Sequence, residues 1–279
     1  MNLKRVTMWL MFLPVLIIMD KRVRYVISSV VSAIGFWSFL TLPYESRYFG
    51  LLAGVVLMVF CFWFGLGIIF TTDFYNRMMT AILPVLFFVS FGMFAVLLPN
   101  SWWLTLLISL FFGIIVYIMF LVENVFWVAI GFRTVPLYRA AYTVGLIIMI
   151  MTAFLAFNSL YSFKMSPWLN FVAVGVIGVL LFLYHFWSVA IELADDGKTQ
   201  SRWTYALVSG LTLAEITLVL SFWPIGIFKS SVYLVSIVYV LAGLIQAAIR
   251  DRLFKRVWLQ YIWIAVAIVL AVIVTTNWR

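Results

Sequence analysis

Nine or ten apolar runs of about 20 residues each follow one another along this chain of 279 residues. A helix of roughly 20 apolar residues is long enough to cross about 30 Å of hydrocarbon. Hydrophobic residues make up 67% of the chain and charged residues 10%, whereas soluble domains are about 45–50% apolar. The sequence therefore predicts an all-α fold, a polytopic transmembrane helix bundle of nine or ten spans, as a single integral membrane domain over residues 1–279.

The apolar runs and the polar residues between them set the expected helix bounds. We expect spans over residues 25–42, 49–70, 77–98, 102–122, 137–160, 168–192, 203–222, 231–249 and 257–275. The N-terminal segment 1–24 contains a shorter run, residues 7–19, which is interrupted by Pro14. That run is short for a span, so it either lies at the membrane interface or forms the first span.

The net charge of +9 does not indicate nucleic acid as a partner. The Lys and Arg residues lie at the ends of the expected helices, where they set orientation and meet anionic lipid headgroups. Alternate loops divide 16 of them twelve to four, and basic residues are retained in cytoplasmic loops. The side with twelve is therefore predicted to be cytoplasmic, with the lipid bilayer as the first expected partner.

Sequence motifs for catalysis or metal binding do not stand out. A single Cys61 and a single His185 cannot supply the ligands of a structural zinc or iron–sulfur site. We find no Gly-rich phosphate loop, no nucleophile elbow and no H-E-x-x-H motif. We therefore expect no metal and no cofactor, and we favour a non-enzymatic protein.

Glu215 is the one acidic residue well inside an expected span. At 1.5 Å per residue it lies roughly 18 Å from the start of its helix. An ionisable residue at this depth is by default a functional candidate and should face protein or water. Ala206, Gly210 and Ala214 form a small-residue stripe that predicts a close neighbouring helix and a place inside the bundle. Glu215 is then either a packed, protonated acid bonded to a neighbour such as Thr212, or a group that binds a proton or a ligand.

His185 lies roughly 10 Å from the predicted cytoplasmic end of its helix, about 8 Å shallower than Glu215. Direct pairing of the two is not expected, whereas a water-linked relay stays open. A lone histidine in a span is more often a buried hydrogen-bonding group than a ligand or proton shuttle. Gln246 and Gln260 are expected at a similar depth, and such a layer suggests a polar cavity open to the cytoplasm.

Four polar residues, Glu123, Asn124, Arg133 and Arg139, lie between the end of the fourth expected span and the first turn of the fifth. Glu123 and Asn124 should emerge at the inner boundary, and residues 125–132 should lie along the membrane interface. Arg133 and Arg139 fall on the same face of the membrane as Glu123. These residues form either an ion-paired corner or a binding site for an anionic lipid headgroup or a soluble partner.

Short motifs between residues 120 and 256 carry a resemblance to a known family. They are Glu123-Asn124-Val125, Arg133-Thr134, Leu137-Tyr138-Arg139-Ala140-Ala141, Ser221-Phe222-Trp223-Pro224 and Arg252-Leu253-Phe254. Together they resemble a family of uncharacterised multi-pass membrane proteins encoded by candidate-phyla bacteria, over residues 120 to 256. The resemblance implies a bacterial cytoplasmic (inner) membrane setting and carries no activity.

Polar side chains are few within the expected spans, and several sit at their boundaries. This distribution favours a non-enzymatic membrane scaffold or a partner subunit that assembles with another membrane subunit. One alternative is a small proton-linked transporter or lipid-handling permease centred on Glu215. A second alternative is a membrane-embedded enzyme that modifies lipids, with polar groups that converge from several helices.

Overall fold

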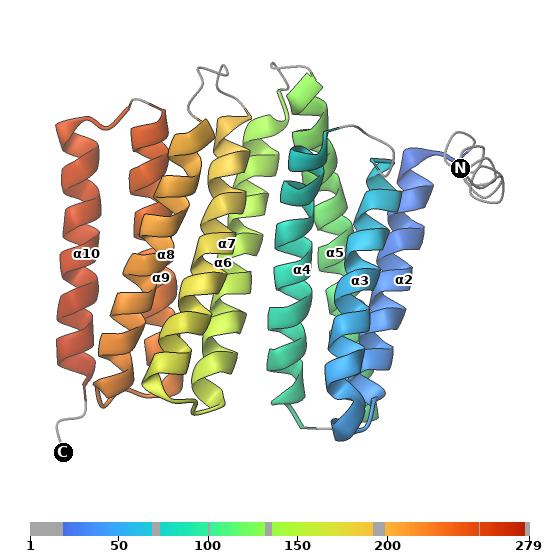
Figure 1. Cartoon of the computed structure of the whole chain (residues 1–279), viewed down its shortest axis with the longest axis horizontal. Coiled ribbons are helices and arrows are strands. Elements are labelled where there is room, and N and C mark those ends of the chain that lie inside the picture. The colour runs from blue at the N-terminus through green and yellow to red at the C-terminus, as the bar shows by residue number, and fades with distance from the viewer. Residues whose placement is uncertain are drawn as a thin grey trace.

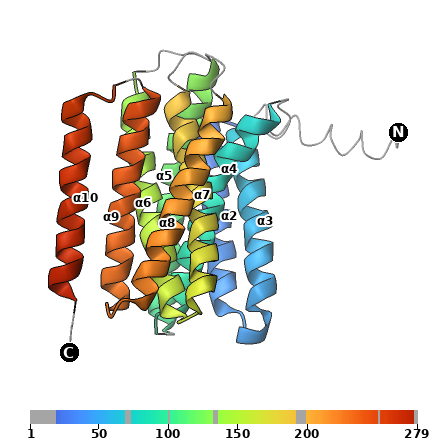
Figure 2. The ribbon, with the colours of Figure 1, turned by 60° about the vertical axis from the view of Figure 1, so that its left-hand side comes forward.

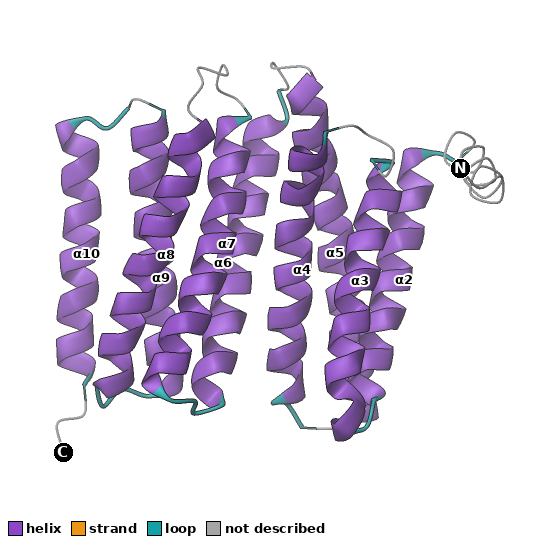
Figure 3. Cartoon of the chain, in the orientation of Figure 1, coloured by secondary structure: helices purple, strands orange, loops and turns teal. Residues whose placement is uncertain are grey.

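The computed structural model describes residues 19–68, 73–99, 101–131, 136–191, 199–250 and 252–276. Within these ranges the chain consists of helices and the loops between them (Figure 3). Nine of the described helices are long and apolar enough to cross a membrane. They are α2 (Lys21–Thr41), α3 (Arg47–Leu66, preceded by the 3₁₀ turn η1, Tyr44–Ser46), α4 (Phe74–Val96), α5 (Trp102–Gly131), α6 (Tyr138–Ser162), α7 (Pro167–Ala190), α8 (Thr199–Phe222), α9 (Ile227–Ile249) and α10 (Lys255–Thr275).

The helices stand side by side and run in alternating directions, with α2 and α3 at one side of the bundle and α10 at the other (Figures 1 and 2). Because they alternate, the predicted cytoplasmic loops all fall at one end, which we call the basic end. This end is at the top of Figure 1. The described basic residues there are Lys21, Arg22, Arg24, Arg77, Arg139, Arg202, Arg250, Arg252, Lys255 and Arg256.

Aromatic side chains fill the centre of the part formed by α2 to α5. Phe36 of α2 stacks on Phe112 of α5 with ring centroids 4.2 Å apart, and Phe62 of α3 stacks on Phe120 of α5 at 4.1 Å. All four rings are fully buried. Such rings bury large apolar areas and add a specific stacking preference, so these contacts set how the first four helices pack.

The predicted helix bounds are confirmed to within four residues at every end but one. The exception is α5, which was expected to stop at Val122 and instead continues to Gly131 over 30 residues. Val122, Phe126 and Ala129 recur at helical spacing and are buried, so the apolar face of the helix goes on past the expected end. The prediction that residues 125–132 lie along the interface is therefore wrong for residues 125–131. Residues 7–18 of the run 7–19 lie outside the described residues.

The small-residue stripe of α8 packs against α7, as predicted. A Cβ atom built on Gly210 would lie 2.7 Å from the backbone nitrogen of Val179, and one built on Gly175 would lie 3.2 Å from the Cβ of Ala214. Small residues let two helix backbones approach this closely. By contrast, α10 packs on α9 and contributes no buried residue within the described range.

Candidate functional site

One turn of α7 near the basic end concentrates the hydrogen-bonding side chains of the bundle interior. It holds Tyr184, His185, Trp187 and Ser188, all of them buried, and we call these four residues the α7 hub. Neighbouring positions on a helix point in different directions, about 100° apart per residue. The hub therefore reaches several neighbouring helices at the same depth.

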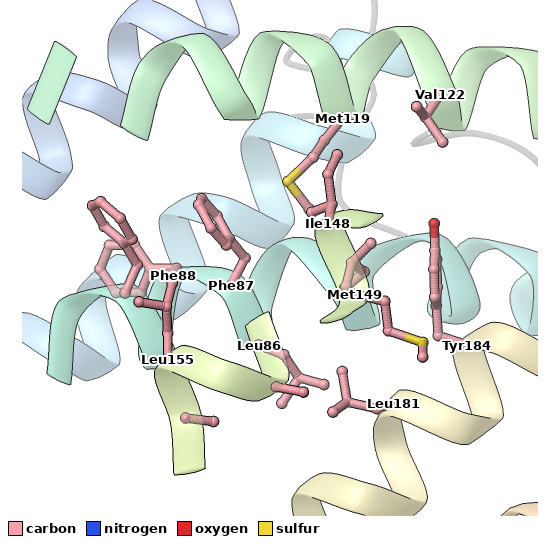
Figure 4. Packing of buried hydrophobic residues seen from close by; sticks show 14 of the residues in the cluster. Leu86, Phe87, Phe88, Met119, Val122, Ile148, Met149, Leu155, Leu181 and Tyr184 are labelled. Carbon is pink, nitrogen blue, oxygen red and sulfur yellow. The ribbon is translucent and has the colours of Figure 1, made fainter. Parts of the chain in front are cut away.

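Tyr184 of the hub reaches α5. Its hydroxyl donates a hydrogen bond of 2.7 Å to Oε1 of Glu123, and Figure 4 shows its ring pointing from α7 toward Val122 of α5. The Glu123 side chain is only 1% exposed, because α5 does not end beside it but continues past it. The second carboxyl oxygen, Oε2, is buried and has no hydrogen-bond partner. Glu123 is thus an interior residue, whereas we expected it from the sequence at the inner boundary of the membrane.

His185 of the hub faces α6. The hydroxyl of Tyr142 lies 3.4 Å from Nε2 of His185 and donates a 2.8 Å hydrogen bond to Oε1 of Gln246 on α9. The guanidinium of Arg250 lies over the Tyr142 ring, 5.5 Å from its centroid, at a distance typical of a cation–π contact. His185 is therefore a buried member of a polar chain that joins three helices. Gln260, expected in the same layer, is exposed on α10.

Two more hydrogen bonds connect the hub to α4 and α6. The indole Nε1 of Trp187 donates to Oδ1 of Asn76 on α4 at 2.9 Å. The hydroxyl of Tyr138, at the start of α6, donates to the backbone carbonyl of Ser188. Buried indole and phenol groups need such partners, because an unmade hydrogen bond in the interior is costly.

Glu215 lies on the outer surface of α8, where its side chain is exposed. The expectation that it faces the inside of the bundle is therefore wrong. The reason lies in its neighbour: Ala214 is buried against α7, and the next residue is turned away by about 100°. The hydroxyl of Thr212 donates a hydrogen bond of 2.9 Å to the carbonyl of Val208 and not to Glu215. The functional role of Glu215 stays a prediction.

Of the remaining predicted inner-boundary residues, the two that the structure describes, Asn124 and Arg139, do not pair with Glu123. Asn124 is partly exposed, and Arg139 is exposed at the start of α6. Arg133 lies outside the described residues. Since Oε1 of Glu123 accepts from Tyr184 and Oε2 has no partner, Glu123 forms no ion pair with Arg139. The structure thus separates the predicted inner-boundary cluster into one buried and one exposed part.

Sequence reasoning missed Tyr142 and Tyr184. A usable signal was present in the run from Tyr184 to Ser188, which places three hydrogen-bonding rings within four residues of one span. Buried tyrosine and tryptophan usually find hydrogen-bond partners, so such a run indicates contacts with several helices. Chemically, the hub fixes the positions of its neighbours. In the described part of the chain, no three His, Cys, Asp or Glu side chains gather closely enough to hold a metal ion.

A family model described as "Protein of unknown function (DUF5656)" matches residues 68–275, a range that includes the α7 hub, Glu123 and Glu215. No curated protein and no solved structure matches the chain. The match covers well over half of the 279 residues, and the chain therefore belongs to this uncharacterised family.

Proposed function

We propose that this protein is a non-enzymatic partner subunit of a membrane complex, and that it binds another membrane protein through the outer face of α8. The observation that carries the proposal is the exposed side chain of Glu215. Glu215 is seven residues from the end of α8 at Phe222, roughly 10 Å along the helix axis. It therefore lies well within the depth of the hydrocarbon.

The surroundings of Glu215 on this face are apolar. Its neighbours one and two turns away are exposed: Val208, Leu211, Val219 and Phe222. An acidic side chain that faces lipid costs about 2.5–3.5 kcal/mol even on the lenient insertion scale. A neighbouring helix that donates a hydrogen bond or a positive charge to the carboxyl group removes most of that cost. The α8 face is therefore suited to a helix of a partner.

Charge complementarity favours a different protein over a second copy of this chain. The described Lys and Arg residues all lie at or near helix ends, so the described part of a second copy offers no cation at the depth of Glu215. A symmetric pair would instead bring two carboxyl groups together, which is unfavourable when both are charged. We therefore commit to a transmembrane helix of another protein with a Lys, an Arg or an amide side chain at the matching depth.

We also propose a bacterial cytoplasmic membrane as the setting, with the basic end inside the cell. The positive-inside distribution of Lys and Arg supports this orientation. The resemblance to proteins of candidate-phyla bacteria supports the origin.

Site-specific photo-crosslinking in the native membrane tests the proposed interface. A photoreactive residue replaces Leu211, one turn from Glu215, and in a matched control it replaces Val56 on α3, which is also apolar and exposed. We expect a discrete protein adduct from position 211 only. Glu215→Lys should abolish the adduct, and a compensating Lys→Glu change in the partner identified by mass spectrometry should restore it.

Two results would contradict this proposal. Equal adducts from positions 211 and 56 would mean that the α8 face has no specific partner. An adduct between two differently tagged copies of this chain would show that the α8 face binds a second copy, which means a homodimer and not the proposed hetero-complex.

A second candidate function, a proton-linked transporter, is favoured by a different observation. Oε2 of Glu123 is buried without a partner, at the depth of the polar chain of His185, Tyr142 and Gln246. With Glu215 on the outside, Glu123 becomes the acid that such a transporter would use. If Glu123→Gln abolishes pH-dependent uptake in reconstituted vesicles while Glu215→Gln does not, this function replaces the one proposed above.

A further inference from the structure

A second group of buried polar side chains lies on the first two turns of α2, outside the family-matched region. Arg24, Tyr25 and Ser28 are 6%, 3% and 2% exposed. Their polar atoms Nε, Oη and Oγ are buried and have no hydrogen-bond partner. Three unpartnered groups on adjacent turns are unusual, because more than nine in ten buried polar groups are hydrogen-bonded.

Arg24 makes the group costly. A guanidinium is always charged, and a buried charge without a counter-ion destabilises a fold by several kcal/mol. Among the described acidic residues, none forms an ion pair with Arg24: Asp20 and Asp73 are exposed, and Glu123 accepts from Tyr184. The described chain therefore supplies no anion for this cation.

The end of α3 packs closely against these donors, and two glycines make this approach possible. Gly67 closes α3 in the left-handed conformation, with φ of 72°, and a Cβ atom built on it would lie 2.9 Å from Nη1 of Arg24. A Cβ atom on Gly65 would lie 3.1 Å from Oγ of Ser28. Any side chain at these two positions would crowd the donors. The carbonyl end of α3 carries only a partial negative charge, about half an elementary charge, and so offsets the guanidinium incompletely.

We infer that Arg24, Tyr25 and Ser28 form a binding site for a phosphate group. Guanidinium N–H groups and the hydroxyls of tyrosine and serine are donors that match the oxygens of an oxyanion. Arg24 is three residues from the start of α2, roughly 5 Å along the axis. This depth at the basic end is that of lipid headgroups. The exposed residues Lys21 and Arg22 add attraction for anions.

The phosphate can belong to a lipid headgroup or to a free ion, and thermal unfolding in an uncharged detergent distinguishes the two sources. The probes are dioctanoyl phosphatidic acid, dioctanoylglycerol as the same chains without phosphate, inorganic phosphate, and sodium chloride at equal ionic strength. We expect saturating phosphatidic acid to raise Tm by about 5 °C, and dioctanoylglycerol and chloride to have no effect. A matching shift with inorganic phosphate would identify the free ion as the natural ligand.

Variants test whether the named residues carry the effect. Arg24→Gln should abolish the shift, whereas Arg256→Gln, which removes an exposed cation at the basic end on α10, should keep it. Tyr25→Phe preserves the ring that stacks on Phe120 at 5.6 Å, and Ser28→Ala is equally mild. Each should weaken apparent binding about fivefold, the loss of one hydrogen bond. These two variants decide the matter if Arg24→Gln does not fold.

Two outcomes would overturn the site. One is an equal Tm shift with the phosphate probe in the wild type and in Arg24→Gln. If Arg24→Gln does not fold, an equal Tm shift in the wild type, Tyr25→Phe and Ser28→Ala has the same meaning. The other is a wild type that responds to neither phosphate probe, while Arg24→Gln is less stable by the same amount in every buffer. In the second case Arg24 only neutralises the carbonyl end of α3.

Discussion

Tyr184 on α7 donates a 2.7 Å hydrogen bond to Glu123 on α5, and both side chains are almost completely buried. The bond links two helices that are separated along the chain by all of α6. It also satisfies one of the two oxygens of a carboxyl group that no solvent reaches. The stability of the bundle should therefore depend on this pair more than on exposed residues of the same type.

We predict that Tyr184→Phe lowers the free energy of unfolding by about 1–3 kcal/mol, because it leaves Glu123 without its hydrogen-bond donor. Thermal unfolding in mild detergent measures the effect. Tyr48→Phe, at an exposed position on α3, is the matched control and should leave Tm unchanged. Equal effects of the two variants would show that the bond contributes nothing.

The polar chain through Tyr142 should show coupling between α6 and α9. We expect Tyr142→Phe and Gln246→Leu each to destabilise the protein by about 1 kcal/mol, the net worth of one buried hydrogen bond. The double variant should cost clearly less than the sum of the two, since both remove the same bond. Strictly additive losses would argue against the hydrogen bond between the two side chains.

Close packing of α7 and α8 predicts a strong effect at Gly210. A Cβ atom there would meet the backbone of Val179 at 2.7 Å and the carbonyl oxygen of Gly175 at 3.0 Å, and neither can rotate away. We expect Gly210→Ala to cost about 3 kcal/mol through overpacking. Gly226→Ala is the control, because no atom lies within 4 Å of the added Cβ. A well-folded Gly210→Ala variant with unchanged Tm would contradict the packing.

The two intramembrane acids should respond differently to the same substitution. Glu123→Leu should destabilise the isolated chain by about 1–3 kcal/mol, since the buried hydroxyl of Tyr184 loses its acceptor. Glu215→Leu, on the exposed face of α8, should lower stability by no more than about 0.5 kcal/mol. Unfolding of both variants in the same detergent checks this contrast. A large loss at Glu215 would indicate that this residue packs within the chain.

Chemical labelling in cells tests the orientation of the bundle. In a Cys61→Ala background, Lys164→Cys and Lys229→Cys lie opposite the basic end and should react with a membrane-impermeant maleimide added outside. Arg139→Cys, at the basic end, should react only after the membrane is opened. The reverse pattern would overturn the positive-inside assignment.

The fold could be predicted from the sequence because long apolar runs have few solutions in a membrane. The end of α5 could not, because the polar pair Glu123 and Asn124 looked like an exit from the hydrocarbon. The apolar residues after them, up to Gly131, continue the buried face, and burial by α6 and α7 outweighs the local polarity. Which helices bury the end of α5 depends on contacts between residues far apart in the sequence. The periodicity within one helix gives no information on such contacts.

The direction in which Glu215 faces also differs from the prediction. The stripe of Ala206, Gly210 and Ala214 correctly predicted a close helix contact, since a Cβ atom built on Gly210 would lie 2.7 Å from the backbone nitrogen of Val179 on α7. The same stripe also fixes the opposite side of α8 as outward, and Glu215 lies on that side. A helical projection of these four residues would have separated them, whereas depth alone suggested that Glu215 faces inward.

The contacts of the α7 hub form in a defined order, because a chain enters the membrane from its N-terminus. When α7 is made, Asn76 and Glu123 are already present, so Trp187 and Tyr184 find their partners at once. Gln246, the acceptor for Tyr142, appears only with α9. A nascent chain that stops after α8 thus holds α4, α5 and α7 together but leaves the hydroxyl beside His185 without its acceptor. The arrival of α9 is therefore the step that completes the polar chain of His185, Tyr142 and Gln246.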